Sequence, residues 1–381
     1  MKARSGNFEL LRIVAMLAII LIHLLGKSAA QQLADMQGIM EYLYWTYFSF
    51  CLIGVNCFIM ISGYFYIENK FKIKKLFILI IQVFFYSVAI VALLLLTGII
   101  TEPVSRWRDI LLPITHNEYW FISVYIALYL LSPFIGEMMD KISRQDHFTI
   151  LFILTILYSV IPTVFFRPVG LEGNGSASLM WFIYLYMLGA YIRKHKTGHT
   201  LISANWKNYI IVTLLLPFFE FIWDMIHRWF GIIIKPDPEA WYINNSLFAL
   251  LASVLLFMIF ANIKNIHIIN SPVILWFGRM AFAVYLIHNN RTLSRVIWGG
   301  EYAAGKLAVP EGGVVPEWII TKWYFPFYAI VLIIVIYALC SAIEFLRSLA
   351  FKPLEQSAIL EKICVHLENS FNKMRKRVIS G

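Results

Sequence analysis

Stretches of about twenty apolar residues, the length that crosses a bilayer core, recur along this 381-residue chain from one end to the other. Because a helix rises only about 1.5 Å per residue, each stretch suits one transmembrane helix. Of all residues, 60% are hydrophobic and 14% are charged, whereas soluble domains carry about 25% charged residues. Transmembrane strands would instead alternate apolar and polar residues over about ten positions. The sequence therefore predicts an all-α, polytopic helical membrane protein and excludes a soluble globular domain.

Polar breaks between the apolar stretches divide the chain into about ten predicted transmembrane helices. Their edges follow the apolar runs alone. The predicted spans are Leu10–Gly26, Tyr42–Phe65, Leu76–Ile99, Tyr119–Met138, Phe148–Phe165, Leu179–Ile192, Tyr209–Ile226, Ser246–Ile263, Val273–His288 and Tyr324–Phe345.

Lysine and arginine gather in the second, fourth and sixth connections and in the C-terminal tail. Such residues are retained on the cytoplasmic side, so we predict that both termini are cytoplasmic. We expect a transmembrane domain over residues 1–350 and a basic cytoplasmic tail over residues 351–381. These positions explain the formal net charge of +10 and indicate membrane lipids, not nucleic acid, as partners. The cations are Lys70, Lys72, Lys74, Lys75, Lys141, Arg144, Arg193, Lys194, Lys196, Lys207, Lys373, Arg375, Lys376 and Arg377.

A cleaved signal peptide is a second interpretation of the first span. A basic N-terminus and an apolar run precede Ser28-Ala29-Ala30, which is typical of such a peptide. Against this interpretation, Glu9, Arg12 and His23 lie in or beside the apolar run. Keeping the segment also gives an even number of spans with a consistent charge bias, so we treat it as the first transmembrane helix.

Two ionisable side chains, Arg12 and His23, lie within this first span. Such groups are expensive in hydrocarbon, so each is a functional candidate. Over the interval between them, about 100° per residue gives about three full turns plus roughly 20°. This places both side chains on one helix face, about 16 Å apart. Taken alone, the pair also fits an arginine that snorkels to the inner headgroups and a histidine that caps the outer end.

Four motifs resemble those of the bacterial acyltransferase-3 family of membrane acyltransferases. Asn7–His23, NFELLRIVAMLAIILIH, resembles the family's opening, whose hallmark is Arg or Lys, ten residues, then His. Gly54–Phe65 resembles the second span, Tyr119–Tyr125 the fourth and Phe277–His288 the ninth. Because the four motifs occur in the family's order, the match is specific, and it covers residues 1–350.

The sequence departs from the family's pattern in two places. Many members have arginines after the second span, where this chain has lysines that keep the charge but lose the bidentate geometry of arginine. The small polar residue usual in the ninth-span motif is replaced by Arg279-Met280-Ala281. A role for that part of the ninth span is therefore not implied.

The resemblance implies an enzyme of the bacterial cytoplasmic (inner) membrane that transfers an acyl group from acyl-CoA. The acceptor would be a hydroxyl of a cell-surface polysaccharide or a lipid-linked glycan. Acetyl is the usual acyl group in the family, so acetyl-CoA is the expected donor, and no metal is expected. Succinyl or another acyl group also fits, and the oligomeric state is not implied.

His23 is the predicted catalytic base, because a hydroxyl that attacks a thioester must lose its proton and imidazole accepts protons near neutral pH. Direct transfer and a transient acyl-histidine both fit this assignment. Arg12, helped by Lys72, Lys74 and Lys75, is predicted to bind the CoA phosphates. The lysines equally fit simple topology signals.

Weaker candidates for acceptor binding lie in other spans. Glu220 and Asp224 share one stripe of the seventh span with Arg228, which also fits a self-compensating ion network. Tyr119 and Trp120 either stack on a sugar or serve as aromatic belt residues at the interface. The full set of these candidates is Asn56, Ser62, Tyr119, Trp120, Glu220, Asp224 and His288.

Three other functions compete with acyl transfer. A transporter or flippase of lipid-linked glycans would also carry intramembrane charges, but such proteins often show internal repeats, and none is evident. A glycan polymerase has no reason to keep the spacing of Arg12 and His23. A membrane subunit without chemistry of its own is the third. Release of CoA in the presence of acceptor separates the acyltransferase from all three.

Overall fold

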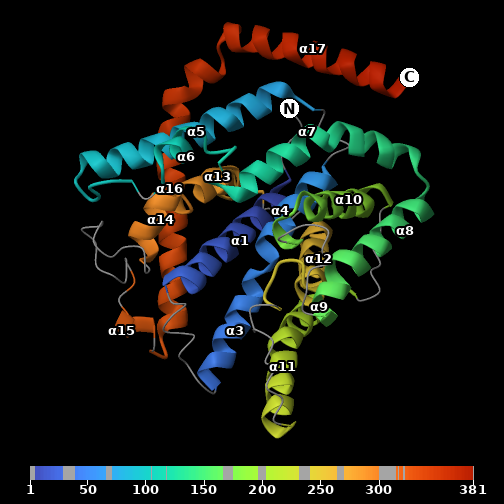
Figure 1. The fold of residues 1–381 in the computed structure, drawn as a ribbon, viewed down its shortest axis with the longest axis vertical. Coiled ribbons are helices and arrows are strands. Elements are labelled where there is room, and N and C mark those ends of the chain that lie inside the picture. The colour runs from blue at the N-terminus through green and yellow to red at the C-terminus, as the bar shows by residue number, and fades with distance from the viewer. Residues whose placement is uncertain are drawn as a thin grey trace.

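The computed structural model describes residues 5–28, 39–65, 71–103, 105–116, 118–165, 175–195, 203–230, 241–263, 270–299, 315, 317–320 and 322–380. Across this part of the chain the fold is a bundle of helices without strands (Figure 1). The helical elements are α1 Gly6–His23, η1 Leu24–Ser28, α3 Ile39–Cys51, α4 Ile53–Tyr64, α5 Ile73–Leu96, α6 Trp107–Leu111, α7 Trp120–Lys141, α8 Arg144–Thr155, η2 Ile156–Val160, α9 Ile161–Phe165, η3 Gly175–Ala177, α10 Leu179–His195, α11 Trp206–Phe230, α12 Leu247–Asn262, α13 Pro272–His288, α14 Arg291–Trp298, α15 Glu317–Ile320, α16 Phe325–Glu355 and α17 Ala358–Ser380.

The predicted spans coincide with these helices, and the all-α membrane class is confirmed. Two apolar helices of the described residues, α12 and α13, are shorter than a full span. The count of ten and the orientation of the termini stay predictions. In the part of the chain that the structure describes, six helical segments are long and apolar enough to cross a membrane: Gly6–Lys27, Glu41–Tyr64, Ile73–Leu96, Trp120–Lys141, Arg144–Phe165 and Phe325–Glu355.

Helix α1 lies near the middle of the bundle, where it packs against α3, α4, α12, α13 and α16 (Figure 1). Its apolar side chains supply part of the main core, including the fully buried Leu11, Ala15 and Ile20. A helix surrounded in this way exposes little of its surface to lipid. The buried Glu9 of α1 therefore faces other helices, which is where functional groups of membrane proteins are found.

Helices α4 and α10 cross at two glycines that allow their backbones to touch. A Cβ at Gly63 would lie 1.9 Å from the carbonyl oxygen of Tyr186, and a Cβ at Gly189 would lie 2.2 Å from that of Met60. Neither carbonyl can move without breaking a helix. Small residues at such crossings are how membrane helices approach closely when no hydrophobic effect drives them together.

We expect Gly63→Ala and Gly189→Ala each to separate α4 from α10 and to lower the yield and melting temperature of the folded protein. Gly26→Ala is the matched control, because its Cβ would meet only Phe48 at an ordinary 3.9 Å. Thermal unfolding of the purified variants in detergent measures the effect. Wild-type melting temperatures for both crossing variants would show that the two helices do not pack this closely.

Helix α17 lies across one end of the bundle (Figure 1). Its Glu361 pairs with Lys74 at the start of α5, and its Phe371 stacks on Phe71 with ring centroids 4.8 Å apart. The expected tail is thus a helix in contact with the second connection. The predicted domain boundary at residue 350 falls inside α16, which continues to Glu355.

Candidate functional site

Helices α1 and α13 run side by side in the same direction, and polar contacts mark both ends of their interface. At the N-terminal end, the backbone N–H of Gly6 donates to Asn270 just before α13, at 3.2 Å. Further along, Glu9 lies against Gly278, whose Cβ would meet the Cβ of Glu9 at 2.6 Å. At the far end, His23 meets His288. The interface therefore connects the Arg12 region with the His23 region along about 16 Å of helix.

The two histidines form a direct pair at the far end of this interface. Nδ1 of His23 lies 3.1 Å from Nε2 of His288, and Nδ1 of His288 lies 2.6 Å from the carbonyl oxygen of Val284. The His288 ring is fully buried, whereas His23 is half-buried. The sequence placed His288 only among weak acceptor-binding candidates and did not pair it with His23.

The Val284 carbonyl determines which nitrogens of a neutral pair carry protons. A carbonyl only accepts, so Nδ1 of His288 must donate and its Nε2 must accept. Nδ1 of His23 is then the donor to His288, which leaves an unprotonated Nε2 on His23. Among the described residues, no contact occupies that nitrogen. A carbonyl, an orienting imidazole and a second imidazole with a free lone pair form an arrangement that suits a general base.

Polar contacts from two loops fix the backbone around His288. The hydroxyl of Tyr119 donates to the carbonyl of Leu286 at 3.1 Å, and the side-chain amide of Asn290 donates to that hydroxyl at 3.0 Å. Tyr119 is fully buried, so in this structure it holds the end of α13 and does not present a face for sugar stacking. Lys27, one turn beyond His23, donates to Asn289 and to Ser294, each at 2.9 Å.

Arg12 forms an ion pair with Glu9, one turn earlier on α1. The Glu9 carboxylate is almost completely buried, while the Arg12 side chain is 27% exposed. A buried carboxylate needs a nearby cation, so part of the charge of Arg12 is used within the protein. The exposed part of the guanidinium still has N–H groups for a ligand, because arginine has five donors.

The three lysines at the start of α5 differ in their surroundings. Lys74 pairs with Glu361 of α17, whereas Lys72 and Lys75 are exposed. The described contacts do not join any of them to Arg12. The hydroxyl of Tyr129 bonds to the backbone of Lys72, which fixes the connection before α5.

Two of the weaker candidates, Asn56 and Ser62, form hydrogen bonds within the helix bundle. Asn56 is fully buried, where it donates to the carbonyl of Asn244 and to Ser253 and accepts from Trp181. Ser62 bonds back to Phe58 of its own helix. The Asn56 amide therefore joins α4 to neighbouring elements, whereas the Ser62 hydroxyl is bonded within its own helix.

The described contacts of the remaining candidates do not include either histidine of the pair. Glu220 is buried and accepts a hydrogen bond from Tyr242 at 2.6 Å. The side chain of Asp224 lies outside the described part of the structure, so the predicted acidic stripe is not tested. Trp120 is half-buried and packs edge-on against Phe182.

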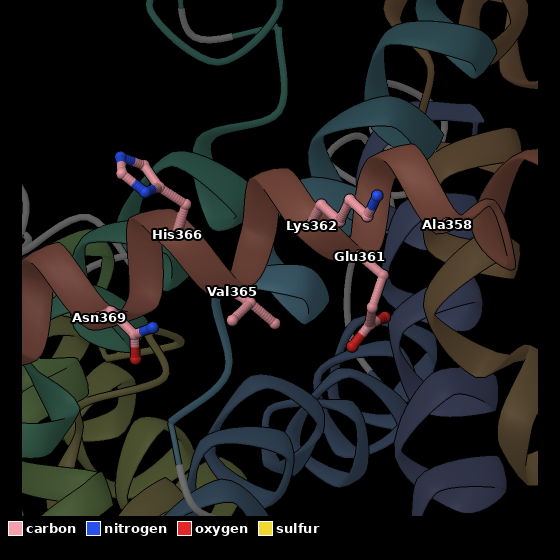
Figure 2. Close-up of a pocket in the computed structure, with 6 residues that line it drawn as sticks. All are labelled: Ala358, Glu361, Lys362, Val365, His366 and Asn369. Carbon is pink, nitrogen blue, oxygen red and sulfur yellow. The ribbon is translucent and has the colours of Figure 1, made fainter.

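An open hollow on α17 is lined by Ala358, Glu361, Lys362, Val365, His366 and Asn369 (Figure 2). All its lining residues come from one helix. Glu361 and Val365 point toward the bundle, whereas Lys362 and His366 point away from it (Figure 2). A hollow of this kind is a surface feature, and neither His23 nor Arg12 lines it.

The fold and the site define a polytopic helical membrane protein with a paired imidazole inside its helix bundle. The chain belongs to the acyltransferase-3 family, because the family model described as an acyltransferase domain matches residues 6–345. The protein is therefore a membrane acyltransferase, and the resemblance of the four motifs is confirmed. No curated protein and no solved structure matches the chain.

Proposed function

We propose that this membrane acyltransferase transfers an acetyl group from acetyl-CoA to a hydroxyl of a surface polysaccharide or lipid-linked glycan in a bacterial cytoplasmic membrane. The observation that carries the proposal is the chain of contacts from Val284 through His288 to His23. It leaves a lone pair on Nε2 of His23 for a proton or an acyl carbon. A transporter has no need of such a nitrogen.

In the direct route, Nε2 of His23 accepts the proton of the acceptor hydroxyl as its oxygen bonds to the thioester carbon. The carbon–sulfur bond then breaks, and the CoA sulfur leaves as a thiolate that takes up a proton. In the acyl-histidine route the same nitrogen attacks the thioester carbon and the CoA thiolate leaves. The acceptor oxygen then attacks the acyl carbon, the carbon–nitrogen bond breaks, and the hydroxyl proton passes to the released imidazole. Both routes depend on the tautomer that His288 imposes, so they share one structural requirement.

Arg12 is the proposed contact for the CoA phosphates at the opposite end of the α1–α13 interface, with Lys72 and Lys75 as exposed cations. The long pantetheine arm of CoA matches the distance of about 16 Å from Arg12 to His23. The charge bias supports a cytoplasmic position for Arg12. Contact between α17 and the start of α5 supports placing the second connection and the tail on one side.

The test of the proposed function is release of CoA from radiolabelled acetyl-CoA by the purified full-length protein. Acceptor is supplied as a glycan extract from the bacterial cell surface. The proposal requires acceptor-dependent CoA release and label in the glycan. Label that crosses a vesicle membrane without CoA release would instead favour a transporter.

We expect Arg12→Ala to raise the KM for acetyl-CoA about tenfold or more, because a hydrogen bond between charged groups contributes about 1.5–3 kcal/mol. The substitution also leaves Glu9 buried without this cation, so its stability is measured in parallel. The double variant Glu9→Gln/Arg12→Ala removes both charges. It should regain stability but keep the high KM, whereas a purely structural Arg12 would give a normal KM in the double variant.

A further inference from the structure

Three cations gather at the far end of α1, beyond the histidine pair. Lys27 lies one turn past His23, and Arg291 and Arg295 lie one turn apart on α14. The Lys27 ammonium donates to Ser294, which lies on α14 between the two arginines, and η1 packs against α14. Figure 1 shows α14 beside this end of the bundle. Like charges repel, so an anion bound among these three cations would lower their electrostatic energy.

Neighbouring residues hold the ammonium of Lys27 and the backbone of Arg291. Two of the three N–H groups of the Lys27 ammonium go to Asn289 and Ser294, which leaves one for a ligand. The backbone N–H of Arg291 donates to Glu118 at 3.1 Å, and the other oxygen of that carboxylate accepts from Ser105 at 2.8 Å. Glu118 thus offsets part of the charge, but its oxygens are already engaged. The guanidinium of Arg291 belongs to an exposed residue.

We propose that Lys27 and Arg291, with Arg295, bind an oxyanion of the acceptor, either a carboxylate or a phosphate on the sugar that is acylated. This inference rests on the proposed function and names the acceptor's chemical class. One helical turn, about 5.4 Å, separates Lys27 from His23. That spacing is comparable to the breadth of one sugar ring. An anion held there would therefore place a hydroxyl of the same sugar beside Nε2 of His23.

The phosphates of CoA do not suit this cluster. The pantetheine arm holds them far from the thioester, whereas Lys27 lies a single turn from the proposed base. A donor whose thioester reaches His23 would keep its phosphates near the other end of α1. The cluster beside the histidines is thus assigned to the acceptor, which makes the acceptor an anionic glycan.

The experiment is calorimetric titration of the purified full-length protein with glucose 1-phosphate, with glucose as the neutral comparison. We expect glucose 1-phosphate to bind at least about tenfold more tightly than glucose. In Lys27→Gln/Arg291→Gln this preference should disappear, while acetyl-CoA affinity stays within about twofold. The matched control is Lys141→Gln/Arg144→Gln, which removes two exposed cations elsewhere and should keep the preference. If the double variant does not fold, Arg291→Gln alone should lower the affinity for glucose 1-phosphate several-fold.

Two results would overturn the assignment. In the first, the wild type shows no preference for the phosphate, or the Lys27 and Arg291 variants retain it. In the second, the substitutions weaken the binding of acetyl-CoA and not that of glucose 1-phosphate. The cluster would then bind the acyl donor. Because the readout is binding without turnover, failure of this inference is distinct from failure of the acyl-transfer proposal.

Discussion

His23→Ala should lower kcat for acyl transfer by about 10²–10⁴, because that is the usual contribution of a positioned general base. The KM for acetyl-CoA should change little, since the proposed phosphate contacts lie at the other end of α1. The measurement is the initial rate of CoA release with saturating acetyl-CoA and glycan extract. Membrane insertion and helical content should match the wild type.

The matched control for this prediction is His366→Ala. It removes an imidazole from an exposed position on α17, where the ring points away from the bundle (Figure 2). Its rate should equal that of the wild type. A His23→Ala protein with near-normal activity would remove His23 from the mechanism, and with it the role proposed for His288.

Much of the fold was predictable because few backbone conformations are stable in the hydrocarbon core of a bilayer. Uninterrupted apolar runs of span length have one stable form, the helix, in which every backbone group bonds internally. The first predicted span, Leu10–Gly26, is found as the helical segment Gly6–Lys27, and Leu76–Ile99 as Ile73–Leu96. Span edges differ by a few residues because polar ends such as Glu9 are buried against other helices rather than placed at an interface.

The histidine pair was not predicted, although the sequence contained a signal for it. Under the predicted topology the first and ninth spans run in the same direction. His23 and His288 each lie near the end of such a span, so both belong at one depth of the membrane. What the sequence does not provide is adjacency in the plane of the membrane, which depends on the close packing of α1 with α13 at Gly278.

The assignment of several polar residues also needed the structure. Asn56 and Tyr119 occur in family-like motifs, and a motif does not distinguish a group that binds substrate from one that holds helices together. Their full burial and satisfied hydrogen bonds indicate the second role. In contrast, the sequence did not single out Lys27, because a cation at the end of a span looks like an interfacial anchor.

His288→Leu should lower kcat by about 10² or more without removing any group that touches substrate. Leucine cannot accept the proton of Nδ1 of His23, so the ring is free to move that proton to Nε2 and to rotate. The lone pair would then lie on the wrong nitrogen. A wrong tautomer at an otherwise intact base is known to cost as much as about 10⁴ in rate.

His288→Gln separates this positioning role from a packing role. The glutamine oxygen can accept from His23 and its amide can donate to the Val284 carbonyl, as both nitrogens of His288 do now. Glutamine should therefore recover much of the rate that leucine loses, although the two side chains fill similar space. Nitrogen NMR of labelled His23 should show the proton on Nδ1 in the wild type and in the glutamine variant, and a mixture in the leucine variant. Equal rates for leucine and glutamine, with an unchanged tautomer of His23, would make His288 a packing residue and leave the choice of the reactive nitrogen to some other contact.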